Sequence, residues 1–415
     1  MEEAFRQPAG TGESPAGGQI TVTNVAQLKD ALDPKNAGKR IIVSSSGTYR
    51  VNSPLRVPDG ASLEGEGVMK YDDGLPVEFT TGKTTITGLP TLEGDLLTLG
   101  NRSSVRRLIL EILEVNTPGV PEDTPKFGNV VAVASGQPGD SVSAAIDECQ
   151  LINKNPAGAG ADGPVGGALL AFTRNPKDDP PHEDAGVTVR VSRSLVEPTG
   201  GGPAVFAMNF ATGGKVTVEL IGNRIRGSLD AVGGLSRPNA VFDATTTIRS
   251  RGNLYSGSDG PAWQIIGGSH GPGEESSGAS ANSASAHSRN DRIKGFQLGI
   301  FALGGRRFSS DGGTSSFNVV ELDLIQLRLE TEGTEAADFL FAGSLSFGPF
   351  LAGDENTVRV RVRKTIGSGP RENLYTHSGG FGTGNQLTFD GTLAAFIRSN
   401  EKIDPAPPAE FFALS

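Results

Sequence analysis

The sequence predicts an all-β fold in which parallel strands wind into a β-helix, a solenoid closed by one N-terminal capping helix. Short runs that alternate apolar and polar residues recur along the chain, as in VTVRVSRSLV at 187–196 and VTVELIGNRI at 216–225. The runs repeat at a nearly constant step, which is 29 residues from Ser194 to Asn223 and 30 residues from Asn223 to Asn253. Strands that repeat with a period of this size are typical of a solenoid.

The composition supports a narrow core. Glycine accounts for 58 of 415 residues, aromatic residues are 6% of the chain, and tryptophan occurs once. Stacked turns build their core from small and β-branched side chains, one thin layer at a time. We expect glycine or asparagine at the corners, where a positive φ is needed, and stacked asparagines can also bond the backbone of neighbouring turns. A pair of all-β sandwiches or barrels is the alternative, but it leaves the regular step unexplained.

The first element is a helix predicted over 24–32. In TNVAQLKDALDP at 23–34, Asn24 or the threonine before it can be the N-cap, Gln27 lies three residues after Asn24, and apolar residues recur on one face up to Leu32. We expect this helix to cover the open edge of the first turn. Residues 1–19 are polar and rich in Pro and Gly, and we interpret them as a flexible tail.

The strand runs follow the helix in order. The first rungs are predicted in SSGTYRV at 45–51 and GASLEGEG at 60–67. A first type of run then carries Cys149, Ser194, Asn223 and Asn253 at its end. A second type places four alanines in register, at Ala168, Ala204, Ala231 and Ala262. We predict one solenoid domain over 20–400, with late rungs in NTVRVRVRKTIGSG at 356–369 and a C-terminal tail at 401–415 that packs on or caps the last turn.

The start of the chain resembles a known superfamily. A cap helix, then G-T-Y at 47–49, then L-E-G-E-G at 63–67 is similar to the beginning of the pectate-lyase-like right-handed parallel β-helix superfamily, and the repeats at 142–303 extend the resemblance. The resemblance implies a right-handed coil that binds polysaccharide in a side groove and cleaves it as a lyase or a glycoside hydrolase. RIK at 292–294 and GSHG at 268–271 follow the order of polygalacturonase motifs, but no N-T-D precedes them, and the W-x-D-H and R-x-P motifs of pectate lyases are missing.

Loop lengths suggest where the groove would lie. The loops after successive second-type runs are long at 173–186, short at 209–214 and 236–240, and longest at 267–291. Two long walls around two short rungs predict a groove two to three turns wide, and turns stack about 4.8 Å apart, which suits a few sugar units.

Several polar residues fall in this predicted groove. Cleavage of a polymer needs paired carboxylates, or a cation that stabilises an anion while a base removes a proton. The catalytic candidates are Arg237, Asp230, Asp243 and His270. The candidates for substrate binding are Lys215, Asn239 and Glu274. Each also has an ordinary interpretation as a solvated corner, turn or loop residue.

A metal site and other partners are also considered. The loop KDDPPHED at 177–184 offers oxygen ligands suited to Ca²⁺ at Asp178, Asp179, Glu183 and Asp184, although without EF-hand spacing, so a solvated loop is the alternative. The net charge of −10 argues against nucleic acid as a partner. No apolar run reaches the roughly 18 residues that span a bilayer. The single Cys149 excludes an internal disulfide and is expected in the core.

A second class of function stays open beside the enzyme. The chain can instead be a non-catalytic solenoid, similar to an adhesin or tailspike, that recognises a glycan or a surface. An ice-binding solenoid would need a regular Thr-x-Thr ladder, which we do not expect on successive turns. The resemblance implies export, with a leader absent from this sequence, while a cytoplasmic location stays open. The residues do not decide between a monomer and a trimer.

Overall fold

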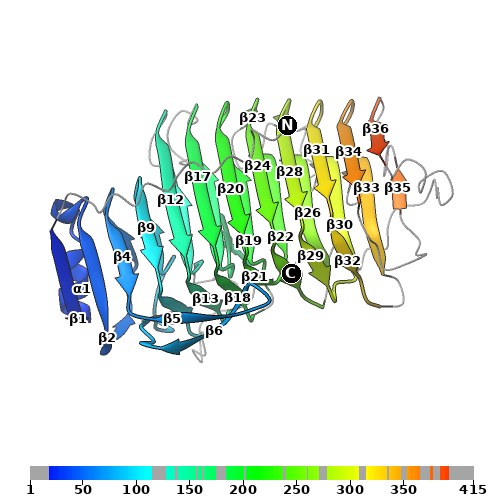
Figure 1. The fold of residues 1–415 in the computed structure, drawn as a ribbon. Helices are drawn as coiled ribbons and strands as arrows, with labels where there is room; N and C mark the ends of the chain where they lie inside the picture. The colour runs from blue at the N-terminus through cyan, green and yellow to red at the C-terminus, as the bar shows by residue number, and fades with distance from the viewer. Residues whose placement is uncertain are drawn as a thin grey trace.

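The computed structural model describes residues 18–114, 128–135, 139–155, 158–160, 163–173, 184–200, 202–236, 240–258, 260–270, 278–307, 315–333, 336–346, 353–364, 374–376 and 384–391. These residues form a right-handed parallel β-helix, as predicted, in which successive turns stack along one axis (Figure 1). Three parallel sheets, here called A, B and C, make up the walls of each turn. The predicted tails at 1–19 and 401–415 lie outside the described residues, except for positions 18 and 19.

Sheet A contains β1 (Gln19–Asn24), the first half of β2 (Arg40–Val51), β4 (Ser62–Gly65), β9 (Ser103–Arg106), β12 (Ser141–Asp147), β17 (Gly186–Ser192), β20 (Lys215–Ile221), β24 (Thr245–Arg251), β28 (Ser283–Arg289), β31 (Val319–Ile325), β34 (Thr357–Arg363) and β36 (Gln386–Gly391). Sheet B contains the second half of β2, β7 (Thr85–Gly88), β10 (Ile109–Ile112), β13 (Gln150–Asn153), β18 (Leu195–Pro198), β21 (Arg224–Arg226), β25 (Leu254–Ser256), β29 (Arg292–Lys294) and β32 (Arg328–Glu330).

Sheet C contains β3 (Leu55–Val57), β8 (Leu97–Leu99), β11 (Val131–Ala134), β16 (Leu169–Thr173), β19 (Val205–Asn209), β22 (Leu229–Ser236), β26 (Pro261–His270), β30 (Leu298–Arg307), β33 (Ala337–Ser346) and β35 (Leu374–Thr376). Outside the three sheets lie an antiparallel hairpin, β5 (Val68–Asp72) with β6 (Leu75–Thr81), a second hairpin, β14 (Gly158–Gly160) with β15 (Gly163–Val165), and the short pair β23 (Val241–Phe242) and β27 (Ala279–Ser280).

The predicted capping helix is confirmed as α1 (Val25–Ala31), which a short 3-10 turn (Pro34–Asn36) follows. Asn24 is the N-cap, and its Oδ1 accepts the Gln27 amide at 3.0 Å. Gln27 Oε1 in return accepts the amide of Thr23, the residue before the N-cap, at 2.8 Å, in an arrangement similar to a capping box. Leu28 and Ala31 are buried, so the helix contributes to the core at the first turn.

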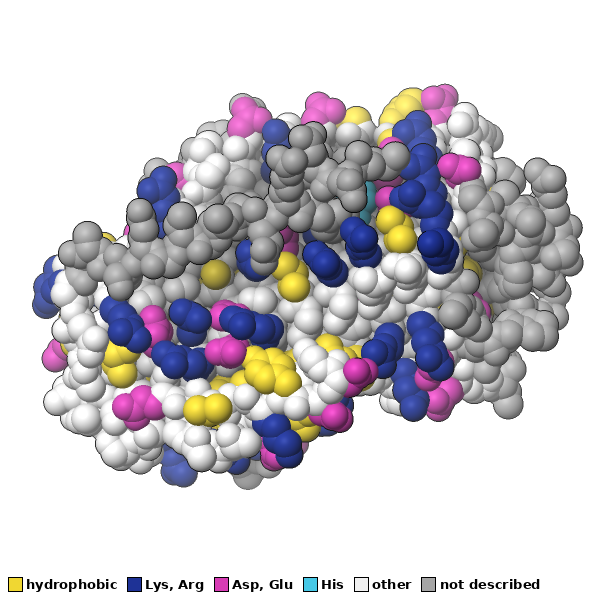
Figure 2. Space-filling view, in the orientation of Figure 1, with side chains coloured by type: hydrophobic (Ala, Val, Ile, Leu, Met, Phe, Trp, Pro, Cys, Tyr) yellow, Lys and Arg dark blue, Asp and Glu magenta, His cyan; other side chains and the backbone are white. Residues whose placement is uncertain are grey.

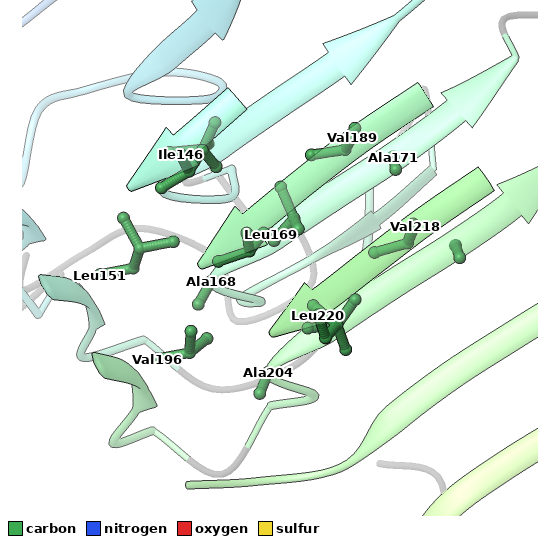
Figure 3. Close-up of a cluster of buried hydrophobic side chains, with 14 of the residues drawn as sticks. Ile146, Leu151, Ala168, Leu169, Ala171, Val189, Val196, Ala204, Val218 and Leu220 are labelled. Atoms are coloured by element: carbon green, nitrogen blue, oxygen red, sulfur yellow. The ribbon is translucent and has the colours of Figure 1, made fainter. Parts of the chain in front are cut away.

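The inside of the coil is filled by small and branched apolar side chains. Residues at alternate positions of sheets A, B and C meet there, and Ile146, Leu151, Leu169, Val189 and Val218 are all fully buried (Figure 3). Each turn adds one such layer, and the next turn covers it. The low content of large side chains is therefore a consequence of the narrow interior.

The corner between sheets A and B holds a ladder of side-chain to backbone hydrogen bonds. Ser194 Oγ accepts the Cys149 amide at 3.0 Å, and Asn223 Oδ1 accepts the Ser194 amide at 2.9 Å. Asn253 Oδ1 accepts the Asn223 amide, and Asp291 Oδ1 accepts the Asn253 amide, both at 2.8 Å. The predicted bonding between neighbouring turns is confirmed, and it satisfies corner amides that no strand can pair.

The predicted glycine or asparagine with positive φ is confirmed at this corner, at Gly222, Gly252 and Asn290, but it lies one position before the ladder residue and not at the ladder asparagines themselves. The residue with positive φ precedes the ladder position, as at Arg193 (50°), Gly222 (62°), Gly252 (64°) and Asn290 (58°). The ladder asparagines are therefore selected for their hydrogen-bonding amide, while the left-handed position before them tolerates several residue types.

A second asparagine ladder runs along the corner between sheets C and A. Each asparagine accepts the backbone amide of the preceding one through Oδ1, with Asn318 on Asn282 at 3.0 Å, Asn356 on Asn318 at 2.9 Å and Asn385 on Asn356 at 2.9 Å. Glycines at the end of the sheet C strands leave room for these side chains. A Cβ on Gly304 would lie 2.6 Å from the Asn356 Cβ and would also contact the Gly343 carbonyl.

Two sequence predictions of register and length need correction. Ala204 faces Ser228, and Ala231 faces Ala207 and Ile265, so Ala231 does not continue the predicted alanine row. The shorter connection before β22 shifts the register by three residues. The predicted loop at 267–291 also contains the end of β26, the whole of β28 and the short β27, so this part of the chain is mostly regular sheet in its described residues.

Candidate functional site

Asp230 is the predicted catalytic residue that the structure places most informatively. It lies on the outer face of β22, between Phe206 and Gln264 of the neighbouring turns. Its side chain is buried, and burial raises the pKa of its carboxyl to about 7, although the Arg306 charge and a bond from Ser228 act in the opposite direction. A carboxyl that titrates near neutrality can act as a general acid or base.

Arg306 belongs to the same face. It lies on β30, is buried, and donates from Nε to Ser269 Oγ at 3.2 Å. Burial lowers the pKa of its guanidinium to about 10, against the opposing effect of the Asp230 carboxylate. Asp230, Gln264, Ser269 and Arg306 therefore form a polar group on this part of sheet C.

The rest of the outer face of sheet C is apolar. Buried side chains on it form a second cluster separate from the main core: Ala132, Leu170, Phe172, Phe206, Met208, Phe210, Val232, Ile266, Leu298, Phe301, Leu303, Ala337, Leu340 and Ala342. Sugars are recognised by polar groups that solvent can reach, whereas the described side chains here are apolar and buried. The predicted groove floor around Asp230 thus has suitable acid–base groups but no open polar surface among the described residues.

Two further predicted residues lie elsewhere. Lys215 is exposed at the start of β20 on the outer face of sheet A, and Asp243 is exposed at the corner before β24, with φ of 55°. Because β20 pairs with β24, these two lie near one corner, whereas Asp230 lies on a different sheet. His270 ends β26 beside Ser236, and its side chain is outside the description.

Of the remaining predicted residues, the structure places only Asp184. Asp184 is exposed at a corner with φ of 54°, and its amide bonds the Thr212 carbonyl at 3.1 Å. The other candidates lie outside the described residues: Arg237, Asn239, Glu274, Asp178, Asp179 and Glu183. Among the residues that the structure describes, no group of three or more His, Cys, Asp or Glu side chains could hold a metal ion.

A dense charge network covers the first turns. Glu64 accepts from Arg40 at 2.9 Å and from Arg107 at 3.1 Å. Asp147 accepts from Arg106 at 3.3 Å and from Arg193 at 2.6 Å. Burial is the largest single effect and raises the pKa of both carboxyls, but the arginines and the bonds from Ser62 and Ser192 together hold the pKa of Glu64 and of Asp147 below the usual range.

The network lacks a group for proton transfer at neutral pH. The carboxylates of Glu64 and Asp147 stay ionised, and the pKa of Arg40 and Arg193 is raised by the carboxylates that accept from them. Burial and the bond to Glu148 raise the pKa of Tyr71 far above neutrality. We interpret this network as a structural clamp that holds adjacent turns together.

The outer face of sheet A carries a row of hydroxyls that the sequence analysis missed. Ser143, Thr188, Thr217, Thr247 and Ser285 face one another in register on five successive turns. Ser285 Oγ donates to Thr247 Oγ1 at 3.1 Å. Threonines do therefore recur on successive turns, but only as one row, because a lysine and a glycine interrupt the parallel row.

Basic side chains gather farther along the same surface. They occupy outer positions of sheets A and B, and the corner between them, on the four turns from β24 to β34. The following ten residues are here called the basic surface: Arg249, Arg251, Arg289, Arg292, Lys294, Arg328, Arg359, Arg361, Arg363 and Lys364. Figure 2 shows Lys and Arg side chains over the C-terminal half of this face, with uncharged surface between them, and further Lys and Arg side chains among Asp and Glu over the N-terminal half.

Acidic residues only partly balance the basic surface. The same described positions hold three acidic residues, Glu321, Asp323 and Glu330, which pair with Arg359 at 2.9 Å, Arg363 at 3.1 Å and Arg328 at 2.6 Å. Glu219 and Asp390 on adjacent turns and Asp73 of the hairpin add three more pairs. Cations remain in excess, although the whole chain has a net charge of −10.

The sequence contained a signal for this surface. In TIRSRG at 247–252, RNDRIK at 289–294 and VRVRVRK at 358–364, the arginines alternate with inward residues, so they must share the outer face. Their gathering on four consecutive turns becomes visible only when the register of the turns is known.

Comparison of the chain with family models, curated proteins and solved structures finds no match. The part of the chain that the structure describes contains no helix of the length and apolar character needed to span a membrane.

Proposed function

We propose that this chain is a glycan-binding solenoid that holds an acidic polysaccharide along the basic surface. The observation that carries the proposal is the excess of cations on four adjacent turns of a chain whose net charge is −10. Except for β32, which pairs only with β29 among the described strands, the strands beneath are hydrogen-bonded on both sides, so the support is rigid. A ligand therefore need not order the backbone that carries the cations.

The spacing of the turns favours a polysaccharide among polyanions. Turns stack about 4.8 Å apart, which is close to the length of one sugar unit in an extended chain. The hydroxyl row from Ser143 to Ser285 ends on the first two of these turns, at Thr247 and Ser285, and can bond sugar hydroxyls. In sheets A and B, the outer positions of the described strands from β24 to β34 carry no Phe, Tyr or Trp side chain, so they lack the large stacking platforms on which bases of single-stranded nucleic acid rest.

The resemblance of the chain to the pectate-lyase-like superfamily is consistent with this proposal and with export, since such polymers occur outside the cytoplasm. Cleavage of the polysaccharide is a second candidate function. Its support is Asp230, with a pKa of about 7, and the nearby charge of Arg306. Both lie on sheet C and not at the basic surface, so binding is the function that we propose first.

The test compares two variants with the same change of charge. One replaces three residues of the basic surface, Arg251, Arg289 and Lys294, with glutamine. Each lost charge contact contributes up to about 1 kcal/mol at an exposed site, so affinity for polygalacturonate should fall about tenfold or more. Affinity for neutral dextran should be negligible in both the wild type and the variant.

The control variant replaces three exposed basic residues of the first turns, Lys35, Arg56 and Arg102, with glutamine. It lowers the net charge equally but leaves the basic surface intact, so its affinity should stay within about twofold of the wild type. An equal loss in both variants would mean that only the net charge acts, and would contradict the proposed surface.

A further inference from the structure

The β5–β6 hairpin departs from the solenoid, and it lies against sheet B. Its strands run along the axis of the coil, across the strands of the sheet (Figure 1). Met69 and Phe79 of the hairpin pack with Leu195 and Ile109 of sheet B in a small apolar cluster. The base of the hairpin is thereby fixed to the first half of the solenoid.

A second contact holds the middle of the hairpin. Tyr71 donates its hydroxyl hydrogen to Glu148 Oε1 at 2.7 Å, at the corner between sheets A and B. Beyond Tyr71 the hairpin turns back through Asp73 and Gly74, which both have positive φ, at 50° and 75°. This geometry is that of a type I′ turn, in which Asn-Gly and Asp-Gly are the preferred pairs.

The tip of the hairpin reaches the basic surface. Asp73 Oδ2 lies 2.9 Å from Arg292 Nη2 on β29, several turns beyond the cluster that fixes the base. Both side chains are largely exposed, at 73% for Asp73 and 53% for Arg292. The carboxylate of Asp73 is therefore paired with Arg292, one of the ten cations to which the acidic ligand would bind.

We infer that the hairpin tip is an internal competitor, and that Asp73 must leave Arg292 before the carboxylate of a polysaccharide can bind it. This inference rests on the proposed function, because it concerns the regulation of the same surface. The base stays fixed by its apolar contacts, so only the tip has to move. Removing an exposed ion pair of this kind should strengthen ligand binding by about two- to fivefold.

The hairpin supplies its own matched control. Asp72, next to Asp73, is exposed and makes no ion pair among the described residues. Asp73→Asn and Asp72→Asn therefore remove the same charge from neighbouring positions, but only the first removes the pair with Arg292. Asparagine also suits the left-handed conformation at position 73, so the turn is preserved.

The experiment measures the affinity of the full chain for polygalacturonate. We expect Asp73→Asn to bind about two- to fivefold more tightly than Asp72→Asn, and the two variants to bind equally once Arg292→Gln is added to both. Equal affinities of the two single variants, in a protein that binds polygalacturonate, would overturn the inference and leave the proposed function standing. A wild-type chain that does not bind polygalacturonate, with Asp73→Asn equally inactive, would overturn both.

Discussion

Replacing Asp291 by asparagine should stabilise the protein at neutral pH. Asp291 ends the ladder at the corner between sheets A and B, where its carboxyl accepts the amide and the side chain of Asn253 and the hydroxyl of Ser288. The sequence SRND at 288–291 repeats SRGN at 250–253 of the preceding turn, in which Asn253 donates to Ser250 Oγ at 2.9 Å. An asparagine at position 291 can therefore adopt a bonding pattern that the fold already contains.

The magnitude follows from the pKa of the carboxyl. Burial raises the pKa of Asp291 to about 6, although its hydrogen bonds act in the opposite direction. An aspartate in an unfolded chain has a pKa of about 3.9, so the shift of about two units corresponds to about 3 kcal/mol. Because the folded pKa is the higher one, the folded state retains its proton longer, and this contribution to stability is present below about pH 4 and lost as the pH rises through about 6.

Denaturant unfolding followed by the fluorescence of Trp263 measures the effect. Tryptophan occurs once in the chain, and the Trp263 ring lies 5.3 Å from that of Tyr255, whose hydroxyl bonds Ser250 at 2.8 Å in the same turn. Near pH 4 the free energies of unfolding of Asp291→Asn and the wild type should be nearly equal. At about pH 7.5 the variant should be more stable by about 3 kcal/mol.

The reasoning would be refuted by a difference that does not depend on pH. Such a result would mean that shape or hydrogen bonding, and not the buried charge, separates the two side chains. The reverse substitution, Asn253→Asp, provides a control because it places a second carboxyl against Asp291. It should destabilise the protein strongly at neutral pH and less in acid, where one carboxyl of the pair is protonated.

Three other predictions concern the solenoid itself. Gly304→Ala should lower the free energy of unfolding by more than about 2 kcal/mol, because its Cβ would meet the carbonyl of Gly343. Gly252→Asn should be nearly neutral in the same denaturation assay, because position 252 is left-handed and no atom lies within 4 Å of the new Cβ. Asn318→Ala should cost about 2–5 kcal/mol, since it leaves the amide of the preceding asparagine and a buried carbonyl without their partners, and hydrogen exchange at that corner should rise. Burial raises the pKa of Cys149 to about 12, so a thiol reagent should label it only in denaturant, and labelling of the native chain would contradict its placement in the core.

Local periodicity was sufficient to predict the inner architecture of the chain. Alternation of apolar and polar residues determines which side chains face inward, and the step from Ser194 to Asn223 to Asn253 equals one turn of the coil. The capping helix was predictable for a similar reason, since Asn24 and Gln27 bond within a few residues of each other. Such features depend on neighbours in the sequence or on a constant repeat.

Features that depend on the length of irregular connections were not predictable. The alanine row failed at Ala231 because the connection before β22 is shorter than its equivalents, and a change of three residues in a loop leaves no periodic signal. The path of the β5–β6 hairpin could not be derived either. Asp73 contacts Arg292 across 219 residues of sequence, and nothing in the local pattern of either segment indicates the other.

The candidate site shows the same division. The sequence predicted Asp230 on the floor of a groove, but its apolar surroundings come from Phe206 and other residues of neighbouring turns, which the local sequence does not indicate. Most residues of the basic surface come from three separate arginine-rich runs of the sequence. These runs form one surface only when the turns stack in register.

The binding of oligogalacturonates of increasing length to the full chain tests the central claim most directly. Four turns about 4.8 Å apart offer room for about four sugar units, so affinity should rise with each added unit up to about that length and then level off. Neutral oligosaccharides of the same lengths should not bind, and added salt should weaken the acidic series. Equal affinity for neutral and acidic chains, or no binding at any length, would contradict the assignment of this surface to an acidic polysaccharide.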